Sequence, residues 1–146
     1  MKIGILGTGE VGDLIGSKLI ENGHQVMMGG RQANNQKGLA FANKHSSANA
    51  SYGTFADASK FGGIIFNATN GRFALEALKL AQTDFADKII IDVANPLDFT
   101  TTPPFTSRLV ASFFERVSSV APSLSRTEVF TTEVVPELLR NTTGTV

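Results

Sequence analysis

Hydrophobic and polar residues follow two alternating patterns along the first hundred residues. Short apolar runs, which are typical of strands buried on both faces, recur at residues 3–6, 25–28, 50–52, 63–67 and 88–93. Between these runs, the spacing of apolar residues predicts helices over residues 11–22, 34–44, 57–61 and 72–82. This alternation predicts an α/β fold: an open, mostly parallel sheet with helices on both faces.

The same spacing predicts which side of each helix turns toward the sheet. In the first helix the expected inner residues are Val11, Leu14, Ile15 and Leu19, and in the second they are Leu39, Phe41 and Ala42. Gly23 follows the first helix and suits a left-handed cap there.

Beyond Pro96 the pattern weakens. One more helix is expected over residues 108–120 and a weaker strand over residues 127–131, followed by threonines and glycine that suggest a frayed end. No internal repeat is visible. We therefore expect a single domain over residues 1–132 and a short C-terminal tail, a candidate for disorder, over residues 133–146.

A glycine-rich turn joins the first strand to the first helix. It reads Gly7-Thr8-Gly9-Glu10-Val11-Gly12, the G-x-G-x-x-G pattern. In a dinucleotide site Gly7 permits the tight turn, Gly9 lets the backbone approach a pyrophosphate, and Gly12 lets the helix pack closely on the strand. The alternative is a glycine turn that binds nothing.

The surroundings of the turn favour the binding interpretation. A strand precedes it, a helix follows it, and another strand comes within about 30 residues, as the motif requires. The N–H groups near Glu10 and Val11, at the start of the helix, would point at the phosphates. The sequence therefore predicts a Rossmann-type domain that binds a dinucleotide.

The end of the second strand indicates which dinucleotide. An NAD site has Asp or Glu there to bind the ribose 2′-hydroxyl, whereas this strand ends at Gly30 and Arg31. Gly30 makes room, Arg31 offers a planar fork for a 2′-phosphate, and Lys37 could add a second positive charge. The alternative is a solvated loop arginine. The pattern predicts NADP, with NADPH preferred over NADH.

Ligands in such sheets bind beyond the carboxyl ends of the strands. Asn67, Thr69 and Asn95 follow two of these ends and could hydrogen-bond the ribose or the nicotinamide amide. The alternative is that Asn and Thr only form turns there.

Composition removes several classes of function. The chain has 13 Lys+Arg against 13 Asp+Glu, which gives no electrostatic reason to expect nucleic acid or a membrane surface as a partner. It has no cysteine and no apolar run of the roughly 18 residues that span a membrane, and its first residues do not lead us to expect a secretory signal. We expect a cytoplasmic protein.

No catalytic residue can be assigned. Neither His24 nor His45 has a partner at a spacing that would indicate a nucleophile, a base or a metal site. Asp92 lies inside a predicted strand and is expected to accept from backbone donors. Hydride transfer between two organic cofactors needs alignment rather than a general acid, so an enzyme is still compatible with the sequence.

Three segments resemble the NADP-binding domain of coenzyme F420-dependent NADP reductases: "MKIGILGTGEVGDLIGSKLIENGHQVMMGGR", "GGIIFNATNGRFALEAL" and "DKIIIDVANPLD". The resemblance implies that the turn around Thr8 and Gly9 holds the pyrophosphate and that Arg31 grips the 2′-phosphate. Gly30 stands where the family has serine, and Ala68-Thr69-Asn70 stands where it has valine and proline.

The resemblance also implies an activity. It indicates an oxidoreductase that transfers hydride between NADPH and a small-molecule redox acceptor, either F420 or a flavin, with a homodimer as a candidate assembly. Members of the family continue into a C-terminal domain that completes the deazaflavin site. A second hypothesis is therefore an NADP-binding module without turnover, either a redox sensor or a truncated remnant.

Overall fold

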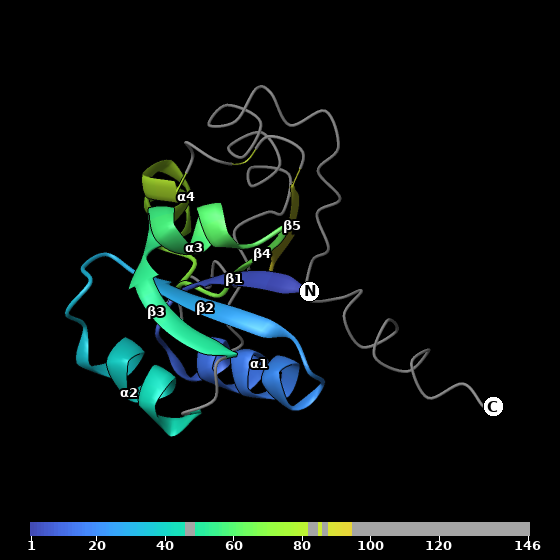
Figure 1. The fold of residues 1–146 in the computed structure, drawn as a ribbon. Helices are drawn as coiled ribbons and strands as arrows, with labels where there is room; N and C mark the ends of the chain where they lie inside the picture. Colours follow the sequence, from blue (N-terminus) through green and yellow to red (C-terminus); the bar gives the residue numbers. More distant parts are fainter. Residues whose placement is uncertain (46–48, 82–84, 86–87, 95–146) are drawn as a thin grey trace, which may run out of the picture.

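Strands and helices alternate through the part of the chain that the computed structural model describes, which is residues 1–45, 49–81, 85 and 88–94 (Figure 1). The elements are β1 (Lys2–Leu6), α1 (Glu10–Glu21), β2 (Gln25–Gly30), α2 (Gln36–Lys44), β3 (Ala50–Thr54), α3 (Phe55–Phe61), β4 (Ile64–Asn67), α4 (Ala74–Ala81) and β5 (Ile89–Asp92). Each lies where the sequence predicts an element of that type. The helix expected over residues 108–120, the strand over 127–131 and the tail over 133–146 lie outside the described residues.

The strands form one parallel sheet in the order β3-β2-β1-β4-β5. β1 is central: Ile5 lies opposite Met28 of β2 on one side and Phe66 of β4 on the other. The chain builds outward from β1 in one direction through β3, then returns to β4 and builds in the other direction. The expected Rossmann-type parallel sheet is confirmed, and its topological switch point lies between β1 and β4.

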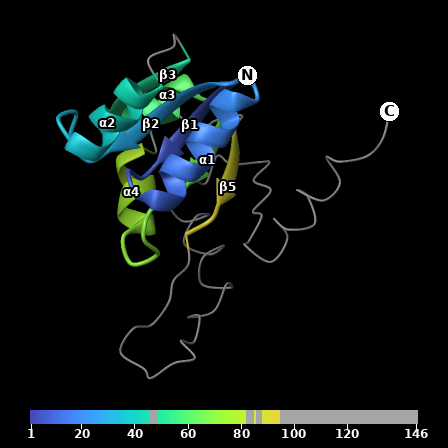
Figure 2. The ribbon, with the colours of Figure 1, turned by 90° about the horizontal axis from the view of Figure 1, so that it is seen from below.

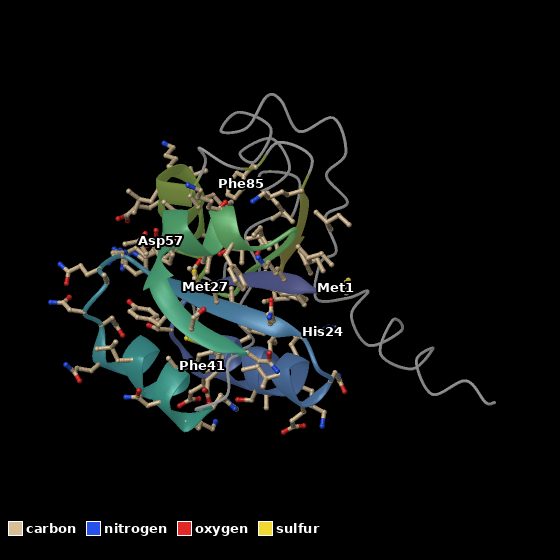
Figure 3. All side chains as sticks on the ribbon, in the orientation of Figure 1. Met1, His24, Met27, Phe41, Asp57 and Phe85 are labelled. Atoms are coloured by element: carbon tan, nitrogen blue, oxygen red, sulfur yellow. The ribbon has the colours of Figure 1, made fainter. Side chains whose placement is uncertain are left out.

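Helices cover both faces of the sheet. α1 and α2 lie on one face and α3 and α4 on the other (Figures 1 and 2). Successive strand residues point to opposite faces, so Ile5 joins the apolar cluster under α1 and α2, whereas Leu6 joins the cluster under α3 and α4. Phe41 and Phe85 mark the two clusters on opposite sides of the sheet (Figure 3).

Glycine forms part of the packed face of α1, in place of some of the large apolar residues predicted there. Val11 and Leu14 are exposed, Leu14 by 72%, so the prediction that they face the sheet is wrong. Ile15 and Leu19 do pack against the core, beside the buried Gly16. A Cβ on Gly16 would lie 2.8 Å from the Phe41 ring, so the ring occupies the space that a larger side chain would need.

In α2, too, a glycine takes an inner position that was predicted for a large apolar residue. Phe41 is buried as predicted, but Leu39 is exposed and Gly38 takes the inner position, with the ring of Tyr52 against it. The helix begins after Asn35, whose side-chain oxygen accepts from the N–H groups of Lys37 and Gly38 at 3.0 and 3.2 Å. This cap fixes the position where the loop after β2 ends.

Candidate nucleotide-binding site

A cleft of about 490 Å³ opens at the carboxyl ends of β1, β2 and β4. This is the position at which parallel α/β sheets bind ligands. Its described lining comes from the glycine turn, the loop after β2, the loop after β4 and the inner sides of α3 and α4: Gly7, Thr8, Gly9, Gly30, Arg31, Gln32, Asn35, Phe55, Ala68, Thr69, Asn70, Phe73 and Ala77.

The three glycines of the turn have different surroundings. Gly7 has a φ of +120°, and a Cβ there would lie 2.6 Å from the carbonyl oxygen of Ala68. A Cβ on Gly12 would lie 2.7 Å from the carbonyl oxygen of Gly7. Gly9 lines the cleft, and a Cβ there would meet nothing within 4 Å. Gly7 and Gly12 are therefore required by the turn itself, whereas Gly9 leaves space open in the cleft.

The start of α1 offers backbone donors to this space. Gly9 is the N-cap, and because it has no side chain it cannot accept from the first N–H groups of the helix. Glu10 and Val11 are the first two helical residues; they do not line the cleft, so they would contribute through their N–H groups. A helix N-terminus with open donors suits a phosphate.

Arg31 lies at the end of β2 and is the only charged residue among those that line the described cleft. Its guanidinium is 3.4 Å from a carboxylate oxygen of Glu76 and 4.9 Å from the centre of the Phe73 ring, both contributed by the α4 region. The Arg31 and Glu76 side chains are each about half exposed. This contact holds the arginine at the edge of the cleft, where an anion could replace the carboxylate.

A buried polar chain links β5 to the loop after β4. Asn67 has no exposed surface; its Nδ2 donates to Asp92 at 3.3 Å, and its Oδ1 accepts from the Thr69 hydroxyl at 2.7 Å. The structure therefore places Thr69 at the cleft and Asn67 behind it. Asn95 lies outside the described residues.

Asp92 is the ionisable member of this hydrogen-bonded series of side chains, and it is buried. Burial raises the pKa of its carboxyl to about 6, against the lowering effect of the hydrogen bonds from the Ala94 N–H and the Asn67 amide. The Ala94 N–H donates to it at 2.6 Å, which confirms the expectation that Asp92 accepts from the backbone.

Several lining residues were not predicted from the sequence. Phe73 precedes α4, and Gln32, Asn35 and Phe55 come from around β2 and α3. The pairing of Arg31 with Glu76 of α4, which does not line the cleft, was not predicted either. The topology could have indicated both contacts from the α4 region, because the chain that follows β4 passes opposite the end of β2. Lys37, the predicted second cation, lies in the first turn of α2 and does not line the cleft.

The histidines lie away from the cleft lining. The His45 ring is 2.8 Å from the Ser17 hydroxyl, and the His24 ring is 3.4 Å from the terminal amine. Among the described residues no group of three side chains could hold a metal ion. Within the same part of the chain, no helix has the length and apolarity needed to cross a membrane.

Residues 2–96 match the sequence model of one protein family, described as coenzyme F420-dependent NADP oxidoreductases. No curated protein matches the chain.

Solved structures also match. A candidate F420-dependent NADP-reductase from Arthrobacter sp. FB24 is 30% identical, with a TM-score of 0.72 over 90% of this chain and 61% of that one. The chain thus spans less than two thirds of this relative's length.

More distant matches support the fold alone. The N-terminal domain of HmdIII from Methanocaldococcus jannaschii is 18% identical, with a TM-score of 0.62 over 90% of this chain and 73% of that one. A reductive aminase from Aspergillus terreus, solved with NADPH and ethyl-5-oxohexanoate, is 21% identical, with a TM-score of 0.58 over 89% of this chain and 39% of that one.

Proposed function

Because the chain belongs to the family of coenzyme F420-dependent NADP oxidoreductases, we propose that its cleft binds NADP(H) for hydride transfer to a deazaflavin or flavin-like acceptor. The observation that carries this proposal is Arg31, which is the charged residue of the described cleft and stands where an NAD site has a carboxylate. The family membership agrees with the resemblance found in the sequence.

Each part of the nucleotide has a matching group in the described residues. No N-cap side chain accepts from the N–H groups at the start of α1, so those of Glu10 and Val11 suit the pyrophosphate, beside the open space at Gly9. Arg31 pairs with the 2′-phosphate. Thr69 lies on the other side of the switch point, toward the nicotinamide half, with Asn95 as a further expected contact from outside the described residues.

The contribution of the protein to the reaction is alignment. NADPH supplies the hydride, and the cleft orients the nicotinamide while it excludes water. No general acid is needed for hydride transfer to a flavin-like ring, which agrees with the sequence, where no catalytic residue can be assigned.

The experiment is a titration of the purified chain with NADPH and NADH, followed by nicotinamide fluorescence. We expect NADPH to bind in the micromolar range and NADH about tenfold or more weakly, with Arg31→Ala closing the gap. Lys79→Ala is the control, because Lys79 is an exposed cation on α4 that does not line the cleft. If neither nucleotide binds, or if Arg31→Ala leaves the gap intact, the proposal is wrong.

A second candidate function is nucleotide binding without turnover, as in a redox sensor or a remnant. It is favoured by the loop after β4, which reads Ala68-Thr69-Asn70 where the family resembled has valine and proline. Loss of NADPH absorbance after mixing with F420 or with FMN distinguishes the two functions. Oxidation of NADPH by one acceptor supports the enzyme and identifies the acceptor, whereas binding without oxidation by either supports the module.

A further inference from the structure

The hydroxyl of Tyr52 on β3 lies beneath the loop that carries Arg31. It donates to the carbonyl oxygen of Gln32, the residue that follows Arg31. The ring of the same side chain lies against Gly38 of α2, just after the loop that joins β2 to α2. A single side chain from a third element therefore connects the start of this loop to the helix that follows it.

Two glycines make room for this side chain. A Cβ on Gly38 would lie 2.0 Å from a carbon of the Tyr52 ring, and a Cβ on Gly30 would lie 2.5 Å from the Tyr52 hydroxyl oxygen. The ring therefore occupies the space beside Gly38, and the hydroxyl occupies the position of the missing side chain at residue 30. The fit involves three residues of β2, α2 and β3 that are far apart in the sequence.

The chemistry of the hydroxyl matches its partner. A phenol has one proton to donate, and here the backbone carbonyl of Gln32 accepts it. Burial raises the pKa of Tyr52, so the hydroxyl keeps its proton at any physiological pH. The loop is thus held by a neutral group that does not compete with Arg31 for an anion.

We propose that Tyr52 is a positioning residue for recognition of the nucleotide 2′-phosphate: its hydroxyl fixes the loop over residues 31–35 and thereby the position of Arg31. Tyr52 does not line the cleft, so it acts through the loop and not by contact with the nucleotide. The inference rests on the proposed function, since it assumes that Arg31 binds the 2′-phosphate.

The first test removes only the hydroxyl. Tyr52→Phe should weaken NADPH binding about threefold to tenfold, as expected for the loss of one hydrogen bond, and change NADH binding by less than about twofold. A general loosening of the fold would weaken both nucleotides together. Ser51→Ala, which removes a hydroxyl that donates to the Val26 carbonyl from the neighbouring position on β3, is the control and should leave the NADPH/NADH ratio unchanged.

The second test uses the close approach at Gly30 and needs no nucleotide. Gly30→Ser should lower the Tm of the wild-type chain, because its Cβ would overlap the Tyr52 hydroxyl. In the Tyr52→Phe background the nearest ring carbon is 3.4 Å away, so the same substitution should cost much less. Equal losses of Tm in the two backgrounds would show that the hydroxyl does not fill this space, and would overturn the inference.

The outcomes separate the two proposals. If the wild-type chain prefers NADPH and Tyr52→Phe leaves this preference unchanged, the role of Tyr52 is overturned and the proposed function stands. If the wild-type chain shows no preference for NADPH, both proposals are overturned. A preference that falls in Tyr52→Phe, together with the background-dependent effect of Gly30→Ser, supports both.

Discussion

An added methyl group should have different effects at two glycines of the same turn: it should mainly weaken nucleotide binding at Gly9 and mainly lower stability at Gly12. Gly9 has a φ of −84° that alanine adopts readily, and its Cβ would meet nothing within 4 Å. Gly9→Ala should therefore cost no more than about 1 kcal/mol of stability, the difference between the two residues at an N-cap, yet weaken NADPH binding at least tenfold because the methyl group occupies the phosphate space.

Gly12→Ala is the matched variant. Its Cβ would lie 2.7 Å from the Gly7 carbonyl oxygen, so the helix or the turn must shift, and we expect a loss of about 1–3 kcal/mol in the free energy of unfolding. Urea unfolding and NADPH titration of both variants give the comparison. A Gly9→Ala chain that binds NADPH with wild-type affinity would show that the phosphates do not lie over Gly9.

Glu76 should oppose nucleotide binding, since its carboxylate holds the same guanidinium that we assign to the 2′-phosphate. Glu76→Gln removes the competing charge and should strengthen NADPH binding a few-fold while NADH binding changes little. Stability should change by less than about 1 kcal/mol, because the ion pair is exposed. Glu21→Gln, which disrupts the exposed pair with Lys18 on α1, is the control. Weaker NADPH binding in Glu76→Gln would mean instead that Glu76 holds Arg31 in its productive position.

At the scale of elements, the junction between β4 and β5 should depend on pH through Asp92. Its folded-state pKa is raised from 3.8 to about 6, so the folded chain retains this proton where the unfolded chain has lost it. The contribution of Asp92 to stability is therefore complete below about pH 4 and is lost as the pH rises to about 6. The full difference is on the order of 3 kcal/mol.

The measurement is the free energy of unfolding of wild-type chain minus that of Asp92→Asn at several pH values. This difference should fall between about pH 4 and 6 and be flat above. Asp57 provides a control of opposite sign, since hydrogen bonds from the Thr54 hydroxyl and backbone N–H lower its pKa. The corresponding difference for Asp57→Asn should fall as the pH is lowered through its folded-state pKa. A rising curve for Asp92→Asn would contradict the raised pKa.

The sequence predicts the type and order of the described elements because strands and helices differ in the spacing of their apolar residues. It is right for Ile15, Leu19 and Phe41 but wrong for Val11, Leu14 and Leu39, since the prediction counts large apolar residues as buried. Gly16 and Gly38 carry no apolar signal, yet each is buried because an aromatic ring from elsewhere packs on it. The partners Phe41 and Tyr52 come from other elements, so the exchange cannot be read from either helix alone.

Some residues of the candidate site could likewise be predicted from the sequence, and others could not. The glycine turn and Arg31 are visible in the sequence because their position relative to a strand and a helix gives them a mechanical role. Glu76 stands 45 residues from Arg31, and nothing in the local pattern connects them. Asn67 also shows the limit: residue type suggested a ligand contact, whereas the fold turns its amide inward to Asp92.

At the scale of the whole molecule, the cleft lies across the switch point and joins the two halves of the sheet. Its described lining comes from the glycine turn after β1, the loop after β2 and the start of α3 on one side, and from the loop after β4 and α4 on the other. A dinucleotide bound there would contact both halves, so both must be folded for it to bind. Binding to the folded chain alone then stabilises the molecule by mass action.

This coupling predicts a specific thermal shift. NADP⁺ at one hundred times its Kd should add about 2.7 kcal/mol, which corresponds to a Tm increase of roughly 8 °C for a chain of this size. NAD⁺ at the same concentration should give about 1.4 kcal/mol less if its affinity is tenfold lower. Arg31→Ala should bring the NADP⁺ shift down to that of NAD⁺. This result would show that the Arg31 guanidinium accounts for the whole difference in affinity between the two nucleotides. Equal shifts in the wild-type chain would mean that the two halves contact only the part that NADP⁺ and NAD⁺ share. The end of β2 would then not distinguish the two nucleotides.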